Sequence, residues 1–134
     1  AIATKPVVVS HTGVKGTCDR TRNLSDEQLS AVARNGGLIG IAFFFEAVCG
    51  NDLAAIVRAI RYTSDRIGFR HVAFGSDFDG AVSTPFDVTG IPDLIAALSA
   101  NGFSPAELSA IAGENVLELL SRNLPVGERT KTKD

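Results

Sequence analysis

The centre of the chain holds an apolar run, LIGIAFFF at residues 38–45. A short apolar run rich in branched and aromatic residues is typical of a strand that is buried on both faces of a parallel sheet. Two similar runs flank it, PVVVS at residues 6–10 and HVAFG at residues 71–75. We therefore predict three strands in this order.

Helical patterns lie between the predicted strands. Ser25 and Gln28 predict a capping box at the start of one helix, and the NGG segment at residues 35–37 is expected to end it. Asn51 is the expected cap of a second helix, whose apolar residues at 53, 56, 57 and 60 form one stripe. Each of these helices would connect two successive strands.

Two further helices are expected after the third strand. Residues 81–90 are expected to form a loop and residues 92–98 a short helix. Ser104, Pro105 and Glu107 then predict the start of a last helix that runs to about residue 122. The residues expected on its buried side are Leu108, Ile111, Val116, Leu117 and Leu120.

This alternation of strands and helices is typical of a parallel sheet with right-handed crossovers. Two α/β architectures fit the pattern, a doubly wound open sheet and a slice of a (β/α)8 barrel. A complete barrel needs about 250 residues, so this chain would hold roughly three of the eight strands.

The composition excludes several classes of protein. The chain is 45% hydrophobic and 21% charged, which is typical of a globular domain, and its net charge of -2 gives no reason to expect nucleic acid or an anionic membrane surface as a partner. The sequence contains neither a dinucleotide-binding glycine motif nor a P-loop. Cys18 and Cys49 are the only cysteines, and we expect both to be reduced thiols.

Polar and charged residues follow each predicted strand, and in parallel α/β folds the active site lies at these strand ends. His11 follows the first strand, residues 43–46 follow the second, and Asp77 and Asp79 follow the third. A neutral imidazole can bind zinc, and a carboxylate can bind zinc or move a proton. The alternative is that the histidine and the aspartates only bind backbone groups in loops and turns.

Position alone favours a role outside the active site for one further histidine and two arginines. His71 lies at the start of the third strand, which is the opposite end of the sheet, and is expected to be structural. Arginines in loops, such as Arg20 and Arg22, are usually solvated.

Several segments, in this order, resemble the membrane (renal) dipeptidase family. VVSHT at residues 8–12 and RTRNLSD at 20–26 resemble the family's Ser-His-Ser segment and the Arg-Asn turn that follows it. GSDFDG at 75–80 resembles its Gly-(Gly/Ser)-Asp-(Phe/Tyr)-Asp-Gly signature. IPDLI at 91–95 and GENVL at 113–117 resemble two later segments, so the resemblance spans about residues 6–121.

The resemblance implies a TIM-type (β/α)8 barrel with two zinc ions. It implies hydrolysis of dipeptides, including L,D-dipeptides, by a metal-activated hydroxide. On this resemblance, His11 is expected to bind the second zinc ion, Arg22 to hold the terminal carboxylate of the substrate, and Asp77 to act as the acid/base residue. Phe44, or a neighbouring residue, falls where some relatives place a tyrosine near the substrate, so that contact is expected to be lost or altered. The residues expected to support the site are Asn23 and Asp79.

The resemblance also implies that this chain is incomplete. The family's His-x-Asp zinc pair, its bridging glutamate and a further zinc histidine belong to earlier strands. Residues 1–134 are therefore expected to be the C-terminal segment of a single barrel domain, with residues 123–134 as a flexible tail, and activity is expected of a longer parent protein. Two other functions stay open, another amidohydrolase-type metal hydrolase and a non-catalytic α/β fragment.

The expected partners follow from the same resemblance. The first and third strands would present open edges, so the missing N-terminal part of the barrel or a second copy of the chain is expected beside them, with a dipeptide as the substrate. No run of residues is long and apolar enough to predict a membrane span, and the compartment stays open between cytoplasmic and exported.

Overall fold

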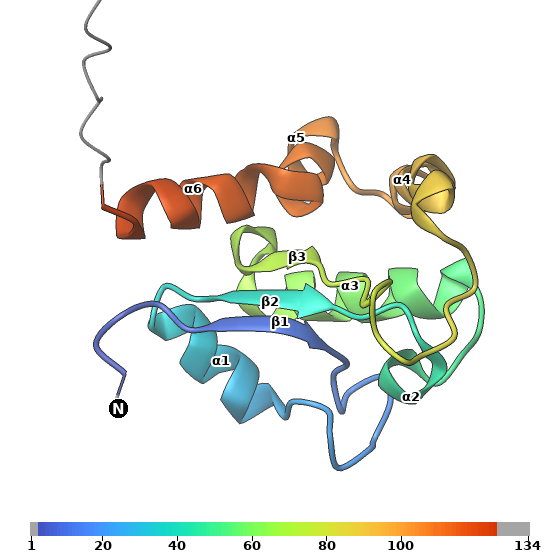
Figure 1. Cartoon of the computed structure of the whole chain (residues 1–134), viewed down its shortest axis with the longest axis horizontal. Coiled ribbons are helices and arrows are strands. Elements are labelled where there is room, and N and C mark those ends of the chain that lie inside the picture. Colours follow the sequence, from blue (N-terminus) through green and yellow to red (C-terminus); the bar gives the residue numbers. More distant parts are fainter. Residues whose placement is uncertain (1–2, 126–134) are drawn as a thin grey trace, which may run out of the picture.

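Three parallel strands form one sheet in the order β1–β2–β3 (Figure 1). The structure is a computed structural model, and it describes residues 3–125. The strands are β1 (Val8–Thr12), β2 (Leu38–Ile41) and β3 (Val72–Phe74). The prediction of an α/β fold with three parallel strands is confirmed. The predicted flexible tail at residues 123–134 lies almost wholly outside the described residues.

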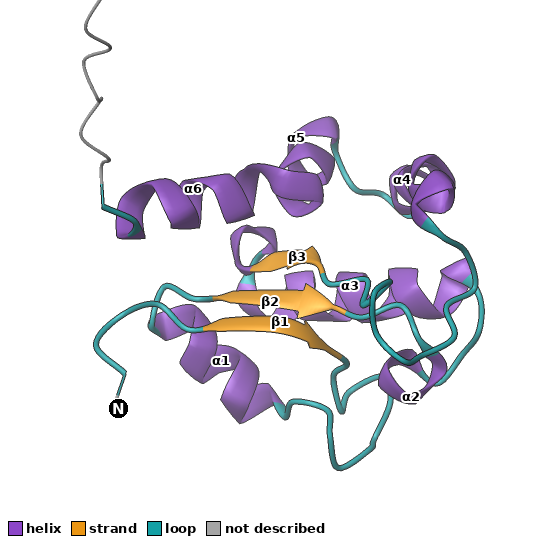
Figure 2. Ribbon diagram, in the orientation of Figure 1, coloured by secondary structure: helices purple, strands orange, loops and turns teal. Residues whose placement is uncertain are grey.

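Helices connect and follow the strands (Figure 2). Short 3-10 turns at Phe69–His71 and Val88–Gly90 precede β3 and α4, and a π-helical turn at Ala110–Glu114 joins α5 to α6. The α-helices are α1 (Asp26–Arg34), α2 (Phe45–Val48), α3 (Leu53–Ile67), α4 (Ile91–Ala100), α5 (Pro105–Ser109) and α6 (Asn115–Asn123).

Local side-chain caps mark the start of three of the six α-helices described, α1, α3 and α5. Ser25 and Gln28 form the predicted capping box of α1, and Ser104 and Glu107 form that of α5. The predicted cap of α3 at Asn51 is wrong by one residue, because the Asp52 carboxylate accepts the hydrogen bond from the Ala55 amide at 2.8 Å.

The second strand is shorter than predicted. The apolar run continues to residue 45, but β2 ends at Ile41 and the short helix α2 begins at Phe45. Phe43 is fully buried against aromatic rings from β3 and the segment after it, so packing rather than strand pairing accounts for the apolar character at that position. An apolar run alone does not distinguish these two environments.

The main core lies between the sheet and helices α1 and α3. Ile39 and Ile41 of β2 are fully buried with Leu29 of α1 and with Ile56 and Ile60 of α3. Burying one such side chain contributes roughly 1.5–3 kcal/mol, so this cluster is the main source of stability for the described fold. Leu94 and Leu98 of α4 extend it.

The last helix differs most from its prediction. A single amphipathic helix was expected from residue 105 to about 122, but the backbone leaves helical geometry at Gly113 (φ 177°, ψ -30°) and the helix is divided there. Ile111 is buried as predicted, whereas Leu117 is 67% exposed and Leu120 is 40% exposed. After the kink, Val116, Leu119 and Leu120 of α6 line a hollow beside the sheet, whereas Leu117 is not among the residues that line it.

The sheet is strongly curved where β1, β2 and β3 end. An added Cβ at Gly40 or Gly75 would lie within 2.2 or 2.3 Å of the Ser10 carbonyl oxygen, although Ser10 and Gly75 belong to segments on opposite sides of β2. The missing side chains at these two glycines therefore permit the outer strands to approach each other over the middle one. None of the helices within residues 3–125 has the length and apolar character needed to span a membrane.

Candidate active site

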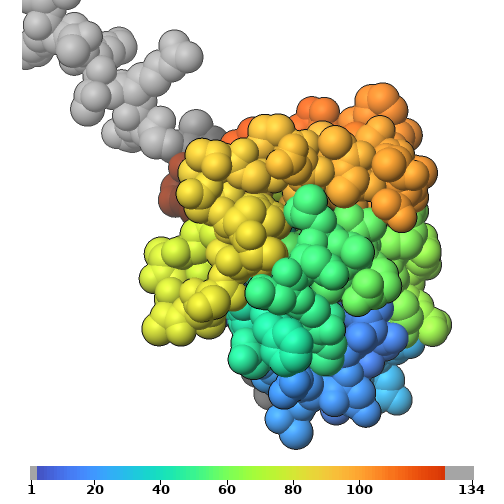
Figure 3. Space-filling model, turned by 90° about the vertical axis from the view of Figure 1, so that its right-hand side faces the viewer, coloured from blue at the N-terminus to red at the C-terminus, as the bar shows by residue number. Residues whose placement is uncertain are grey.

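The loops that follow the three strands meet on one face of the molecule. Figure 3 shows this face, with the segment after β1 in blue, the segment after β2 in teal and the segment after β3 in yellow. Parallel strands run in one direction, so their carboxyl ends share an edge of the sheet. Residues 43–46 and Asp77 with Asp79 follow β2 and β3 at this edge as predicted, whereas His11 lies within β1 near its end rather than after it.

A pocket of about 710 Å³ opens among these loops. It brings together three of the residues singled out in the sequence, because Arg22 comes from the loop after β1, Phe44 from the segment between β2 and α2, and Asp77 from the loop after β3. The remaining lining residues are Phe45, Glu46, Asn51, Ala81, Val82 and Ser83.

Asp77 has an unusual backbone conformation that turns the chain at the pocket. Its φ is 62°, in the left-handed region that residues with side chains other than Asn and Asp seldom adopt. Its carbonyl oxygen accepts a hydrogen bond from the Gly80 amide at 3.0 Å. A Cβ at residue 80 would lie 2.5 Å from the Asp77 carboxylate, so glycine leaves the space that the carboxylate occupies.

An aromatic cluster holds the segment that carries Asp77 against the end of β2. The ring of Phe43 lies 5.8 Å from that of Phe78 and 5.4 Å from that of Phe86, measured between centroids. The Phe43–Phe78 pair is edge-to-face, an arrangement that stabilises by about 0.5–1.5 kcal/mol beyond the buried area, and the Phe43–Phe86 pair is tilted. Residues 78 and 86 lie on either side of the stretch 81–83 that lines the pocket. The aromatic cluster therefore holds this stretch in place.

Two arginines of the loop after β1 stack on two phenylalanines next to α2. The guanidinium carbon of Arg22 lies 4.8 Å from the centre of the Phe44 ring, and that of Arg20 lies 5.5 Å from the Phe45 ring. A cation over an aromatic face is attracted by about 0.5–1 kcal/mol at exposed sites. The stacking orients the Arg22 guanidinium at the pocket wall.

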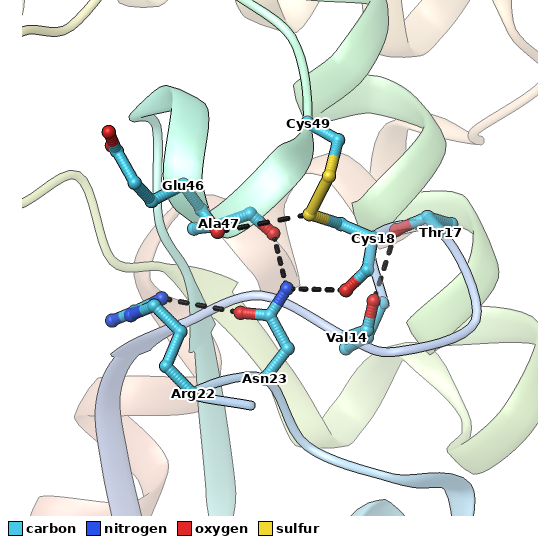
Figure 4. Close-up of a disulfide and its surroundings, with 8 residues drawn as sticks. All are labelled: Val14, Thr17, Cys18, Arg22, Asn23, Glu46, Ala47 and Cys49. Atoms are coloured by element: carbon cyan, nitrogen blue, oxygen red, sulfur yellow. Dashed lines mark hydrogen bonds between the residues drawn. A yellow bond between two sulfur atoms is a disulfide. The ribbon is translucent and has the colours of Figure 1, made fainter. Parts of the chain in front are cut away.

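Asn23 lies beside Arg22 and is 2% exposed (Figure 4). Its side-chain oxygen accepts a hydrogen bond from Arg22 Nη1 at 3.3 Å. Its amide nitrogen donates to the carbonyl oxygens of Cys18 at 2.7 Å and Ala47 at 2.9 Å. A single buried amide thus joins Arg22, the loop after β1 and helix α2.

A disulfide joins Cys18 to Cys49 beside this amide (Figure 4). The expectation that both cysteines are reduced thiols is wrong. The loop after β1 folds back through a bridge between Val14 and Leu24, and Cys49 ends α2 in a left-handed conformation, which brings the two Cα atoms to 5.3 Å. A separation of 31 residues in the sequence contains no sign of this proximity.

The other predicted site residues lie outside the pocket lining. His11 is exposed near the end of β1, where its Nδ1 and the Ser10 hydroxyl are 2.9 Å apart. Asp79 is exposed in the turn after Asp77. His71 lies at the opposite end of the sheet with Nδ1 at 2.9 Å from the Gly37 carbonyl oxygen, which agrees with its predicted structural role.

The described residues do not form a complete zinc site. Within residues 3–125, no three His, Cys, Asp or Glu side chains are grouped so that they could hold a metal ion. A catalytic zinc ion needs three protein ligands, and a structural one needs four. His11 offers one imidazole at the expected strand end, so any zinc site would need ligands from outside this set.

Glu46 and Asn51 also line the pocket, although the sequence placed Glu46 only within the group 43–46 and Asn51 only as a helix cap. Glu46 lies in the first turn of α2 and is exposed, so it adds a second carboxylate to a pocket that contains Asp77. The sequence does give one sign of this position, because Glu46 directly follows the apolar run and residues 43–46 were expected at a strand end.

Comparisons with known proteins agree with these motifs. The family model described as Membrane dipeptidase (Peptidase family M19) matches residues 1–133. A relative named dipeptidase ataJ, from Aspergillus terreus, is 35% identical over 99% of this chain and 34% of its own length. An uncharacterised protein from the pqqA 5' region of Klebsiella pneumoniae is 39% identical over 88% of this chain and 47% of its own length.

A solved structure has the same fold over most of the chain. It is a metallo peptidase from Rhodobacter sphaeroides, liganded with a phosphinate mimic of the dipeptide L-Ala-D-Ala, and it matches with a TM-score of 0.83 and 32% identity over 90% of this chain and 37% of that one. The chain thus spans between a third and a half of the length of these relatives. Because the family model covers nearly every residue, the chain belongs to the membrane dipeptidase family.

Proposed function

We propose that this chain forms part of a zinc-dependent dipeptidase that hydrolyses dipeptides, including those with a D-residue at the C-terminal position. One observation carries the proposal. Arg22, Phe44 and Asp77 follow different strands and nevertheless line one pocket at the carboxyl ends of the sheet. Family membership supports the reaction, and the L-Ala-D-Ala mimic bound to the Rhodobacter sphaeroides peptidase supports the substrate class.

Each of the three residues has a role that its chemistry suits. The planar guanidinium of Arg22 would bind the terminal carboxylate of the dipeptide through two parallel hydrogen bonds. The Asp77 carboxylate, held by a tight turn, would move a proton at the scissile bond. Phe44 would serve as the platform on which Arg22 stacks, since the two side chains are already in contact.

Family membership and the position of His11 support zinc as the metal of the proposed enzyme. The imidazole of His11 would be one ligand, and the other ligands would come from residues outside this chain. No step of the reaction is assigned to a metal from the residues described above, because they do not complete a site.

We further propose that the three strands are a section of a (β/α)8 barrel. The parallel order and the pronounced curvature at Gly40 and Gly75 support this, since a barrel wall is a closed, curved parallel sheet. The fraction of each relative that the chain covers is also that expected of about three strands out of eight.

The test is hydrolysis of a panel of L,L- and L,D-dipeptides, with and without added zinc. It is made on this chain alone and on a full-length protein that contains it. We expect cleavage by the full-length protein that a chelator abolishes and zinc restores, and no cleavage by the 134-residue chain. Absence of cleavage in the full-length protein would refute the proposed activity, and zinc-dependent cleavage by the chain alone would refute the view that its site is incomplete.

A further inference from the structure

We infer that Asn23 is the residue that positions Arg22 for the substrate carboxylate, and that the Cys18–Cys49 disulfide keeps Asn23 in place. The inference rests on the proposed function, in which Arg22 binds the terminal carboxylate of a dipeptide. It adds a positioning residue and a covalent brace to that site, neither of which touches the substrate.

Two contacts hold the Arg22 side chain. Its guanidinium contacts the Phe44 ring at 4.8 Å and the Asn23 side-chain oxygen at 3.3 Å. Phe44 is the N-cap residue of α2, and Asn23 donates to Ala47 within α2. Both contacts of the guanidinium therefore depend on where α2 lies relative to the loop after β1.

Three hydrogen bonds fix the orientation of the Asn23 amide. Its nitrogen donates to two backbone carbonyls, those of Cys18 and Ala47, so its oxygen must face the opposite side, where Arg22 Nη1 donates to it. The amide cannot turn over without losing all three hydrogen bonds. A buried carbonyl left without a donor costs about 1–3 kcal/mol, so this orientation is strongly preferred.

The surrounding backbone is shaped for this amide. A Cβ at Gly13 would lie 1.8 Å from the Ala47 carbonyl oxygen and 2.7 Å from the Asn23 amide nitrogen. Any larger residue at position 13 would separate the loop from α2. The close approach of the two segments is thus required for the Asn23 contacts.

The disulfide joins the two segments that contact Asn23. Cys18 supplies a carbonyl oxygen to Asn23 and its sulfur is bonded to Cys49, the residue that ends α2. The bond spans the same two segments that the Asn23 amide joins (Figure 4). Without the disulfide, only non-covalent contacts would join the loop after β1 to α2 around Asn23.

The test compares two buried asparagines in the full-length protein. Asn115 is 5% exposed and its amide nitrogen donates to the carbonyl oxygens of Phe69 and Val72, both at 2.8 Å, at the opposite end of the sheet. Asn23→Ala and Asn115→Ala therefore delete the same number of backbone contacts without adding a charge. The readouts are KM and kcat for one dipeptide, with the urea midpoint measured for each variant.

We expect Asn23→Ala to raise KM at least tenfold while kcat stays within threefold of the starting protein. Asn115→Ala should lower the urea midpoint and leave KM within twofold. In a background of Arg22→Lys, the added effect of Asn23→Ala on KM should shrink to less than threefold, because the fork that Asn23 positions is already absent. Equal KM changes in the two asparagine variants, or independent effects of Arg22→Lys and Asn23→Ala, would overturn the inference.

Removal of the disulfide gives a second route, which also serves if Asn23→Ala does not fold. Cys18→Ser with Cys49→Ser should raise KM several-fold with kcat within threefold. An unchanged KM in the disulfide-free protein overturns the inference. A full-length protein that cleaves no dipeptide at all would instead refute the proposed function, so the two failures are distinguishable.

Discussion

Asp77 and Asp79 show how two neighbouring carboxylates can have different surroundings. Both occur in one GSDFDG segment after β3. The turn at Asp77, with its positive φ and its hydrogen bond to Gly80, directs Asp77 to the pocket, while Asp79 is exposed beyond it. The segment alone could not separate these two positions, because the separation arises from a left-handed residue.

We predict that Asp77→Asn lowers kcat of the full-length protein by about 10²–10⁴-fold, the range for loss of a general acid or base. The amide has nearly the same shape as the carboxylate, so KM and the urea midpoint should change little. Steady-state kinetics on one dipeptide make the measurement. Asp19→Asn is the control, because its side chain is 84% exposed and it should behave like the starting protein. A turnover within threefold of normal for Asp77→Asn would mean that Asp77 is structural.

At the same scale, the sequence could predict which residue types gather at the strand ends. It could not predict the contacts among them. Stacking of Arg22 on Phe44 and the hydrogen bond from Asn23 to Ala47 depend on α2, a helix of four residues whose start lies within an apolar run. The disulfide depends on the same packing.

Among the elements, those with local start signals were predicted best. Both capping boxes are formed by residues three apart, so the sequence contains all that is needed. The end of β2 and the exposed side of α6 are different, because each depends on what packs against an apolar residue. Leu117 fits the apolar side of one continuous helix in the sequence, but in the structure the helix is divided at Gly113 and Leu117 is 67% exposed.

The two capping boxes should respond differently to acid. Glu107 accepts hydrogen bonds from the backbone amide and the hydroxyl of Ser104, both at 2.8 Å, and these bonds hold the pKa of Glu107 below its usual value of 4.5. A carboxyl whose pKa is lowered by folding stabilises the fold above its unfolded pKa, and this contribution is lost as the pH falls through the folded pKa. The capping box of α1 has the neutral Gln28 in the same position.

We therefore predict that Glu107→Gln makes the urea midpoint less sensitive to pH below about 4.5. Gln28→Glu should have the opposite effect, because it places a carboxyl in the first box. Unfolding curves between pH 7 and pH 3 make the comparison, with each variant measured against the starting protein. Asp87, whose pKa is lowered by hydrogen bonds from the Thr89 hydroxyl and amide, will leave some acid sensitivity in every variant. Identical pH profiles for Glu107→Gln and the starting protein would contradict the prediction.

Taken as a whole, the described part of the molecule leaves apolar surface uncovered beside an open sheet. β1 and β3 are each paired on one side only within residues 3–125. Val8 of β1 is 52% exposed, and it lines a hollow together with Leu120 of α6, which is 40% exposed. Open strand edges with apolar side chains favour pairing with another chain.

We predict that the 134-residue chain, made by itself, associates with other copies or aggregates at micromolar concentration. Light scattering after size-exclusion chromatography measures the mass. Val8→Lys with Leu120→Lys should shift the protein toward the monomer, because a lysine on an edge strand and a charge in the hollow oppose strand pairing. Ala54→Lys with Ala96→Lys adds the same charge at exposed positions on α3 and α4, and should leave association unchanged.

Comparison of the two lysine pairs shows whether association depends on one specific surface or only on the net charge of the chain. If both lysine pairs reduce association equally, net charge rather than the edge of β1 and the hollow beside α6 governs it. If the unmodified chain is a monomer that melts cooperatively, the three-stranded sheet is sufficient by itself, and the barrel section proposed above would not need its neighbours to be stable. The prediction stands only if the pair at Val8 and Leu120 acts and the pair on α3 and α4 does not.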